Sequence, residues 1–184
     1  MAVLGVDIDP QPRYPFAFVQ ADALVFLERY GDLFDSVSAS PPCQAFTLAQ
    51  RIQGNQHPDL IAPTRALLTE LGRPWIIENV PGAPLLYPML LCGAMFGLHT
   101  YRHRLFETGG GFRFSAPPHP EHTARTVKMG RPLKDGDFYH AVGNFQNVDY
   151  VRRDLAMPWA TRDGLRECIP PAYAEHIGKQ LLTR

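Results

Sequence analysis

The segment Ser40–Gln44 reads Ser-Pro-Pro-Cys-Gln and carries the sharpest chemical signal of the sequence. Two prolines fix the backbone directly ahead of Cys43, so that the turn holds the thiol in one direction, as a nucleophile requires. The alternative is a buried cysteine that packs as a small apolar residue, a common place for this residue type. On this segment alone, the two interpretations have about equal weight.

Two further polar motifs could act with this thiol. Glu78 directly follows a short apolar run, so its carboxyl group could face the same cleft; the alternative is a glutamate that only caps the next turn. The run Arg102-His103-Arg104 adds positive charge, and on a strand its two arginines would point the same way. A solvated basic strand edge is the alternative for this run.

These residues need strands and helices to position them. Apolar runs predict strands over 3–7, 16–20, 34–39 and 75–77. Helical spacing and capping residues predict helices over 23–30 and 58–71. The alternation predicts an α/β fold with a parallel sheet, whose active groups lie at the carboxyl ends of the strands. Four polar side chains stand at such ends: Asp7, Asp22, Cys43 and Glu78.

The second half of the chain has less periodicity. Short strands are predicted over 89–92 and 104–107, and the stretch 109–148 is rich in Gly, Pro, His and Arg. That composition is typical of a mobile loop region or a small appended lobe. Thr161 is a plausible N-cap for a helix over 162–168, and a closing helix follows Pro170-Pro171 and ends at Leu182.

Composition excludes several classes of protein. The 184 residues are 45% hydrophobic and 20% charged, which is ordinary for one globular domain with a single core and excludes a disordered, collagenous or coiled-coil chain. No apolar run reaches the roughly 18 residues of a membrane span, and the start lacks a signal peptide's features. We therefore expect a cytoplasmic protein that does not enter the membrane.

Charge and cysteine content limit the partners. Eighteen Lys and Arg balance eighteen Asp and Glu, so no global field attracts nucleic acid, and a phosphate contact needs a local patch. The basic residues of 125–153 could supply such a patch or could be solvated charges. The three cysteines form no Cys-x-x-Cys pair, and His119 and His122 look like half a metal site at most. A surface loop is the favoured interpretation there, and the sequence predicts no metal site.

Taken together, the motifs resemble those of the DNA (cytosine-5) methyltransferase family, particularly its compact bacteriophage members. The family's Pro-Cys-Gln motif matches Pro42–Gln44, its Glu-Asn-Val motif matches Glu78–Val80, and its Arg-x-Arg motif matches Arg102–Arg104. Residues 166–178 resemble the family's late motifs. Each motif alone is weak, whereas the three central motifs in this order are specific.

The resemblance implies a Rossmann-like sheet that binds S-adenosylmethionine. Asp7 would hold the ribose hydroxyls of this cofactor, and Asp22 would meet the adenine amino group. The implied cofactor-binding residues are Asp7, Ile8, Asp22, Ala23 and Pro41. The implied domains are a catalytic domain over 1–108 and 156–184 and a short target-recognition region over 109–155.

The resemblance also implies a covalent mechanism on DNA. Cys43 would add to carbon 6 of a flipped or single-stranded cytosine, Glu78 would protonate ring nitrogen 3, and Arg104 would bind the ring oxygen. The polar loop 44–57 would serve as a lid. The implied catalytic residues are Cys43, Glu78, Arg102 and Arg104; the implied substrate-binding residues are Gln44, Asn79, Arg125 and Arg131.

One departure from the family lies at the N-terminus. The family begins with a strand and a glycine-rich turn that cradles the methionine part of the cofactor, whereas this chain reaches the family's second strand at once. We expect two exposed strand edges, over 3–6 and 37–39, that either pair directly or take a strand from another molecule, with self-association favoured. We also expect weakened binding of S-adenosylmethionine.

Two other functions stay open from the sequence. The first is a truncated, catalytically silent relative that binds DNA or a partner subunit. The second is modification of free cytosine nucleotides, suggested by the short recognition region and the neutral charge. A phage-encoded enzyme of this kind would act in the cytoplasm of a bacterial host.

Overall fold

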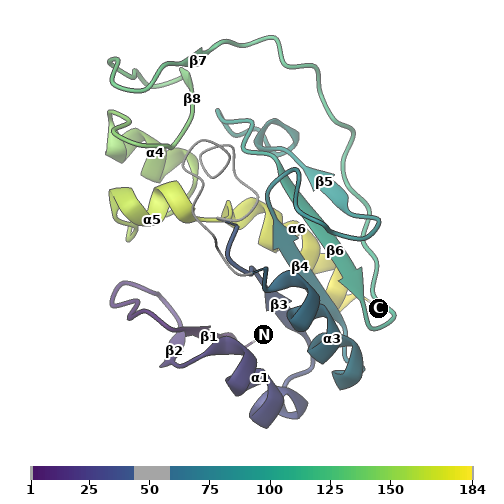
Figure 1. Cartoon of the computed structure of the whole chain (residues 1–184). Helices are drawn as coiled ribbons and strands as arrows, with labels where there is room; N and C mark the ends of the chain where they lie inside the picture. The colour runs from purple at the N-terminus through teal and green to yellow at the C-terminus, as the bar shows by residue number, and fades with distance from the viewer. Residues whose placement is uncertain (1, 44–58, 184) are drawn as a thin grey trace. The chain divides into compact units, whose positions relative to one another are not determined.

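The computed structural model describes residues 2–43 and 59–183, and it divides into two compact units (Figure 1). The first unit comprises Met1–Met89 and Leu105–Arg113; the second comprises Leu90–Arg104 and Phe114–Arg184. Each unit has a hydrophobic cluster of its own. This arrangement differs from the single core that the chain length suggests.

The boundaries of these units do not follow the expected ones at 108 and 155. In the second unit, buried residues of 133–145 pack against those of 150–165 in one cluster, and residues 105–113 belong to the first unit. The cluster that buries Tyr139 and Phe145 also includes Ala160 and Leu165, which lie beyond residue 155. The functional division into catalytic and recognition segments stays a prediction.

The first unit begins with a pair of parallel strands and a helix. Strand β1 (Leu4–Asp7) pairs with β2 (Ala17–Gln20), and Asp7 lies opposite Gln20 at the carboxyl end of the pair. Helix α1 (Ala23–Tyr30) follows at once and has the bounds that helical spacing predicts. The 3-10 helix η1 (Gly31–Leu33) then turns the chain toward the next strand.

A second sheet of the first unit contains the strands with the cysteine and glutamate motifs. Strand β3 (Val37–Ala39) pairs in parallel with β4 (Trp75–Asn79), and α3 (Ile61–Leu71) lies between them in the sequence (Figure 1). Every residue of β4 is buried, as expected for an apolar strand in a sheet interior. Leu68 of α3 packs with Trp75 and Ile77 of β4 in the core of this unit.

The sheet expectation needs two corrections. Strand β6 (Arg104–Gly109) runs antiparallel to β4, so the sheet is mixed rather than parallel. Strands β1 and β3 belong to different sheets, so direct pairing of 3–6 with 37–39, one of the two expected outcomes, is absent from the described residues. A strand taken from another molecule stays a prediction.

A partly buried ion pair connects α3 to β6 within the first unit. Arg65 donates from Nε to Glu107 Oε1 at 2.6 Å and from a terminal nitrogen to Oε2 at 2.8 Å. The backbone N–H of Leu86 donates to the same carboxylate at 2.8 Å. The hydrogen bond to Glu107 raises the pKa of Arg65. The same bond holds the side chain of Glu107, a residue that is 3% exposed, in place.

As far as the structure describes it, the second unit contains two very short strands, three α-helices and long loops. The chain enters it through β5 (Met89–Leu91) and the 3-10 helix η3 (Gly93–Phe96). Its further elements are β7 (Thr126–Val127), β8 (Phe138–Tyr139), α4 (Val148–Asp154), α5 (Arg162–Glu167) and α6 (Pro171–Leu182). The stretch 109–148, expected to be a mobile loop region or a small appended lobe, contains two paired strands and several buried side chains. Among the described residues, no helix is long and apolar enough to cross a bilayer.

Asp154 is the polar centre of the second unit. Its carboxylate accepts a hydrogen bond from the Tyr139 hydroxyl at 2.7 Å and contacts His99 Nδ1 at 2.7 Å. The backbone N–H of His99 donates to the same group at 3.0 Å. Burial and the bond to Asp154 raise the pKa of Tyr139, so this phenol stays a neutral donor.

Candidate active site

The carboxyl ends of β3 and β4 form the core of the candidate site. The strands are parallel with Ala39 opposite Ile77, so the turn that follows β3 and the last residues of β4 lie at one edge of the sheet. Cys43 belongs to that turn and is partly buried. Glu78 is 6% exposed and lies opposite Phe106 of β6. The first unit thus places the thiol segment and the carboxyl group on neighbouring strand ends.

Asn79 links these two strand ends directly. Its amide nitrogen Nδ2 donates to the carbonyl oxygen of Pro41 at 2.9 Å, and its Oδ1 accepts from the backbone N–H of Val80 at 2.9 Å. The residue is 1% exposed, so these bonds form away from water. Asn79 therefore holds the Pro-Pro-Cys turn against β4, a role that its place in the sequence did not reveal. Its predicted contact with substrate stays a prediction.

A second strand edge of the first unit carries the residues expected to bind the cofactor. Asp7 ends β1 and Asp22 follows β2, and the backbone N–H of Ala21 donates to the Asp7 carbonyl at 2.9 Å. The Asp7 carboxylate accepts from the N–H of Asp9 at 2.9 Å. This bond orients the carboxylate at the end of β1.

Asp22 has a structural role at this edge. Its Oδ1 accepts from the backbone N–H groups of Leu24 and Val25 at 2.9 and 3.0 Å, which makes it the N-cap of α1. Ala23, the first residue of α1, is exposed, and Ile8 beside Asp7 is 66% exposed. In such an arrangement, the carboxylate can bind a ribose hydroxyl, and the exposed aliphatic side chain can cover one face of an aromatic base.

Arg102 and Arg104 belong to the second unit. Arg102 was expected on a strand with Arg104, but β6 begins at Arg104 and Arg102 has φ 24°, in the left-handed region. Its guanidinium donates to the backbone carbonyls of Cys168 at 2.9 Å and Arg166 at 2.6 Å, and these bonds hold it in the bend before the strand. Arg104 donates to the His103 carbonyl at 2.9 Å. The catalytic roles of both arginines stay predictions.

The other two cysteines are unsuited to nucleophilic attack. Burial raises the pKa of the Cys92 thiol, which is 0% exposed. Burial also raises the pKa of Cys168, and the positive charges of Arg102 and Arg104 only partly oppose this effect. Because the thiolate is the reactive form, both thiols are disfavoured as nucleophiles relative to an ordinary cysteine.

Several predicted substrate contacts lie elsewhere. Gln44 and the proposed lid over 44–57 fall outside the described residues. Arg125 and Arg131 are exposed residues of the second unit on either side of β7, so they can reach a ligand in solution. Their contact with a substrate stays a prediction.

Comparison with known proteins gives structural likeness alone. No model of a known family matches the chain, and no curated protein matches it. A crystal structure from an E. coli prophage, whose protein carries the provisional description of a DNA modification methyltransferase, aligns with a TM-score of 0.43 and 20% identity. The alignment covers 71% of this chain and 55% of that one, so this chain spans little more than half its length.

Proposed function

We propose that this chain is a DNA (cytosine-5) methyltransferase that uses S-adenosylmethionine and a covalent cysteine adduct. The observation that carries the proposal is the hydrogen bond from Asn79 to Pro41, which ties the Pro-Pro-Cys turn to the Glu-Asn-Val strand end. Two of the three motifs on which the family resemblance rests are thereby joined in one unit. A nucleophile and a proton donor at neighbouring strand ends suit addition to an electron-poor ring.

The first chemical step uses Cys43 and Glu78. The thiolate of Cys43 forms a bond to carbon 6 of cytosine, and the electrons of the carbon 5–carbon 6 double bond move into the ring. Ring nitrogen 3 takes up the proton that Glu78 holds, so negative charge does not accumulate on the ring. Carbon 5 becomes the nucleophilic end of an enamine, which the unmodified base is not.

The remaining steps restore the ring. Bound S-adenosylmethionine supplies an electrophilic methyl group for carbon 5. A base then removes the proton from carbon 5, the sulfur–carbon 6 bond breaks to re-form the double bond, and Cys43 leaves as a thiolate. Ring nitrogen 3 returns its proton to the Glu78 carboxylate, so the base leaves as neutral 5-methylcytosine. The motif resemblance assigns Arg104 to the ring oxygen, where a guanidinium stabilises developing negative charge. The target base must stand outside a stacked duplex throughout.

The residues at the end of β1 fit the nucleoside part of this cofactor. Asp7 offers an oriented carboxylate for two ribose hydroxyls, and the exposed Ile8 offers an apolar face for adenine. Asp22 and Ala23 stand where α1 begins, and the Asp22 oxygen that does not cap the helix can accept from the adenine amino group.

Methyl transfer to DNA tests the proposal. We expect the chain to transfer tritiated methyl groups from S-adenosylmethionine to cytosine in DNA, Cys43→Ala to reduce this to background, and Cys168→Ala as matched control to retain it. Transfer to cytidine monophosphate but not to DNA would favour modification of free nucleotides. DNA binding with no transfer to either substrate would favour a catalytically silent relative.

Binding of S-adenosylmethionine tests the cofactor edge separately. Asp7→Asn keeps an oxygen that can accept from the N–H of Asp9 but removes the charge that faces the ribose. Because a charged hydrogen bond is lost, we expect Asp7→Asn to bind S-adenosylmethionine about ten- to a hundredfold more weakly in equilibrium dialysis. The control is Asp9→Asn, at a neighbouring exposed residue. Equal affinity for both variants would remove Asp7 from the proposed site.

A further inference from the structure

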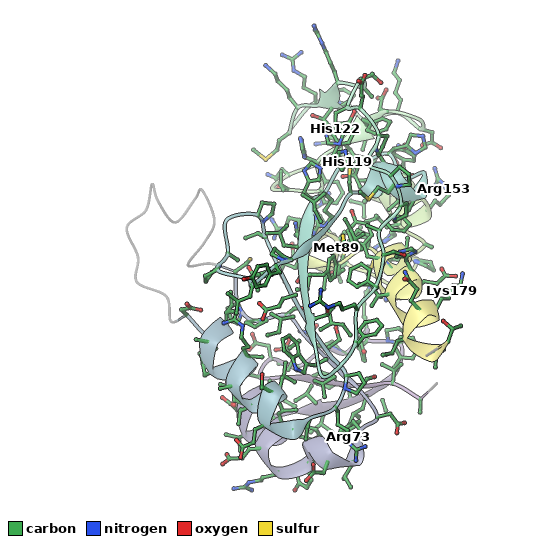
Figure 2. All side chains as sticks on the ribbon, turned by 90° about the vertical axis from the view of Figure 1, so that its right-hand side faces the viewer. Arg73, Met89, His119, His122, Arg153 and Lys179 are labelled. Carbon is green, nitrogen blue, oxygen red and sulfur yellow. The ribbon has the colours of Figure 1, made fainter. Side chains whose placement is uncertain are left out.

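Four side chains with metal-binding atoms gather in the second unit. They are Cys92, His103, His119 and His122, and one ligand atom from each lies within 4.8 Å of every other. Figure 2 labels two of them, His119 and His122, whose rings lie beside each other with centroids 4.9 Å apart. No other group of this kind occurs among the described residues. The cluster takes no part in the proposed methyl transfer.

Two of the distances match a tetrahedral metal site. Cys92 Sγ lies 3.3 Å from His122 Nε2, and His103 Nε2 lies 3.1 Å from His119 Nε2. Bond lengths of about 2.0 Å to nitrogen and 2.3 Å to sulfur place tetrahedral ligand atoms about 3.3 Å apart for two nitrogens and about 3.5 Å apart for nitrogen and sulfur, so both pairs are within about 0.2 Å of this geometry. The longest separation in the cluster, at most 4.8 Å, needs a contraction of about 1.3 Å to reach this range.

The segments that supply Cys92 and His103 are held side by side. The backbone N–H of Gly93 donates to the Tyr101 carbonyl at 2.9 Å. A side chain at Gly93 would place its Cβ 2.0 Å from the Thr100 carbonyl oxygen, so only glycine permits this close approach. The position of Cys92 relative to His103 is therefore set by backbone contacts, independently of any metal.

Tyr101 also fixes the loop that supplies the other two histidines. Its ring stacks on His122 with centroids 3.6 Å apart and an interplanar angle of 16°. Its hydroxyl donates to the Ala124 carbonyl at 2.9 Å and accepts from the Ala124 N–H at 3.1 Å. Hydrogen bonds and stacking around the ligands orient them, as outer-shell contacts do in known metal sites.

We propose that Cys92, His103, His119 and His122 bind one zinc ion that fastens the loop 119–122 to the segment 92–103. One thiolate and three imidazoles suit zinc, whereas magnesium and calcium prefer oxygen ligands and find none in this set. Four protein ligands complete a tetrahedral shell, so the ion has a structural role. This inference does not rest on the proposed methyltransferase activity.

The full-length chain, freed of metal by chelation and dialysis, provides the direct test. We expect it to take up one zinc ion per chain, and cobalt in its place to show a thiolate charge-transfer band together with the visible bands of tetrahedral coordination. Zinc at about a hundredfold excess over its dissociation constant should raise the melting temperature by about 5 to 10 °C. Substoichiometric uptake, or cobalt spectra without a thiolate band, would overturn the proposal.

Variants separate the site from adventitious histidine binding. His119 is exposed, so His119→Ala should leave the fold intact while weakening zinc affinity at least about a hundredfold. The matched control is His140→Ala, because His140 is an exposed histidine of the same unit outside the cluster. Cys92→Ser should remove the charge-transfer band. Equal zinc affinity in the His119 and His140 variants would show that the histidines only form hydrogen bonds to one another.

Discussion

The two compact units of this chain are built in different ways. In the first, periodic apolar residues form regular strands and helices, and Ile77 of the fully buried β4 anchors the core. In the second, two strands of two residues each and long loops accompany polar contacts between residues far apart in sequence, such as that of His99 with Asp154. The difference teaches that local sequence pattern is sufficient to predict the packing of regular strands and helices. It is insufficient to predict packing that depends on contacts between residues far apart in sequence.

The strongest test of this contrast is the ion pair of the first unit, in which the carboxylate is buried. Arg65→Ala leaves the Glu107 carboxylate, 3% exposed, without its charged partner. We expect the free energy of unfolding to fall by about 3 to 5 kcal/mol in urea titrations. Arg73→Ala, at an exposed arginine labelled in Figure 2, should change it by less than about 0.5 kcal/mol. If the free energy of unfolding fell by less than about 1 kcal/mol in Arg65→Ala, the helices and strands of this unit would not need the ion pair for their stability.

The polar centre of the second unit should give the next largest effect. Asp154→Ala leaves the hydroxyl of Tyr139, a residue 1% exposed, without its acceptor, and we expect a loss of about 2 to 3 kcal/mol by thermal and urea unfolding. The matched control is Asp149→Ala, because Asp149 forms only an exposed ion pair with Arg152 on the same helix. Equal losses for the two variants would contradict the central role of Asp154.

The smallest stability effect is expected at the link between the motifs. Asn79→Ala removes the bond to the Pro41 carbonyl, and we expect a loss of about 1 to 2 kcal/mol. Because the turn that carries Cys43 would lose its orientation, covalent capture of a cytosine substrate should slow roughly ten- to a hundredfold. A variant that loses stability but captures substrate at the normal rate would show that the bond serves only the fold.

Much of the first unit could be predicted from its residues. Helix α1 has the predicted bounds, since its apolar spacing lies between the N-cap Asp22 and Gly31. Strands β1 and β3 do not pair with each other, in line with the two exposed strand edges that we expected. The antiparallel direction of β6 could not be predicted from its sequence. A run of alternating residues contains no information on strand direction.

In the second unit, the predicted elements are the strand at 89–92, which the structure has as β5, and the two helices that a capping threonine and a proline pair mark. Thr161 accepts from the N–H of Gly164 and begins α5 as expected, and Pro171 begins α6. Helix α4 was missed because it is short and stands in a stretch rich in Gly, Pro and His, although Asn147 caps it. Its buried residues Tyr150 and Val151 face partners that only the fold brings near.

The candidate sites show the same limit. The neighbouring placement of Cys43 and Glu78 follows from strand ends, a local feature, whereas the bond from Asn79 to Pro41 depends on side-chain geometry. The cysteine–histidine cluster joins three segments, and only the pair 119 and 122 has ligand-like spacing. No local pattern could indicate that Cys92 completes it.

Trapping on DNA that carries 5-fluorocytosine tests the central claim most directly, because fluorine at carbon 5 blocks the final proton removal. With S-adenosylmethionine present, we expect an adduct that survives denaturation and whose DNA is attached, by peptide mass spectrometry, to Cys43. Cys43→Ala should form no adduct, while Cys168→Ala should form it normally. An adduct that persists in Cys43→Ala, or that maps to Cys92 or Cys168, would contradict the account.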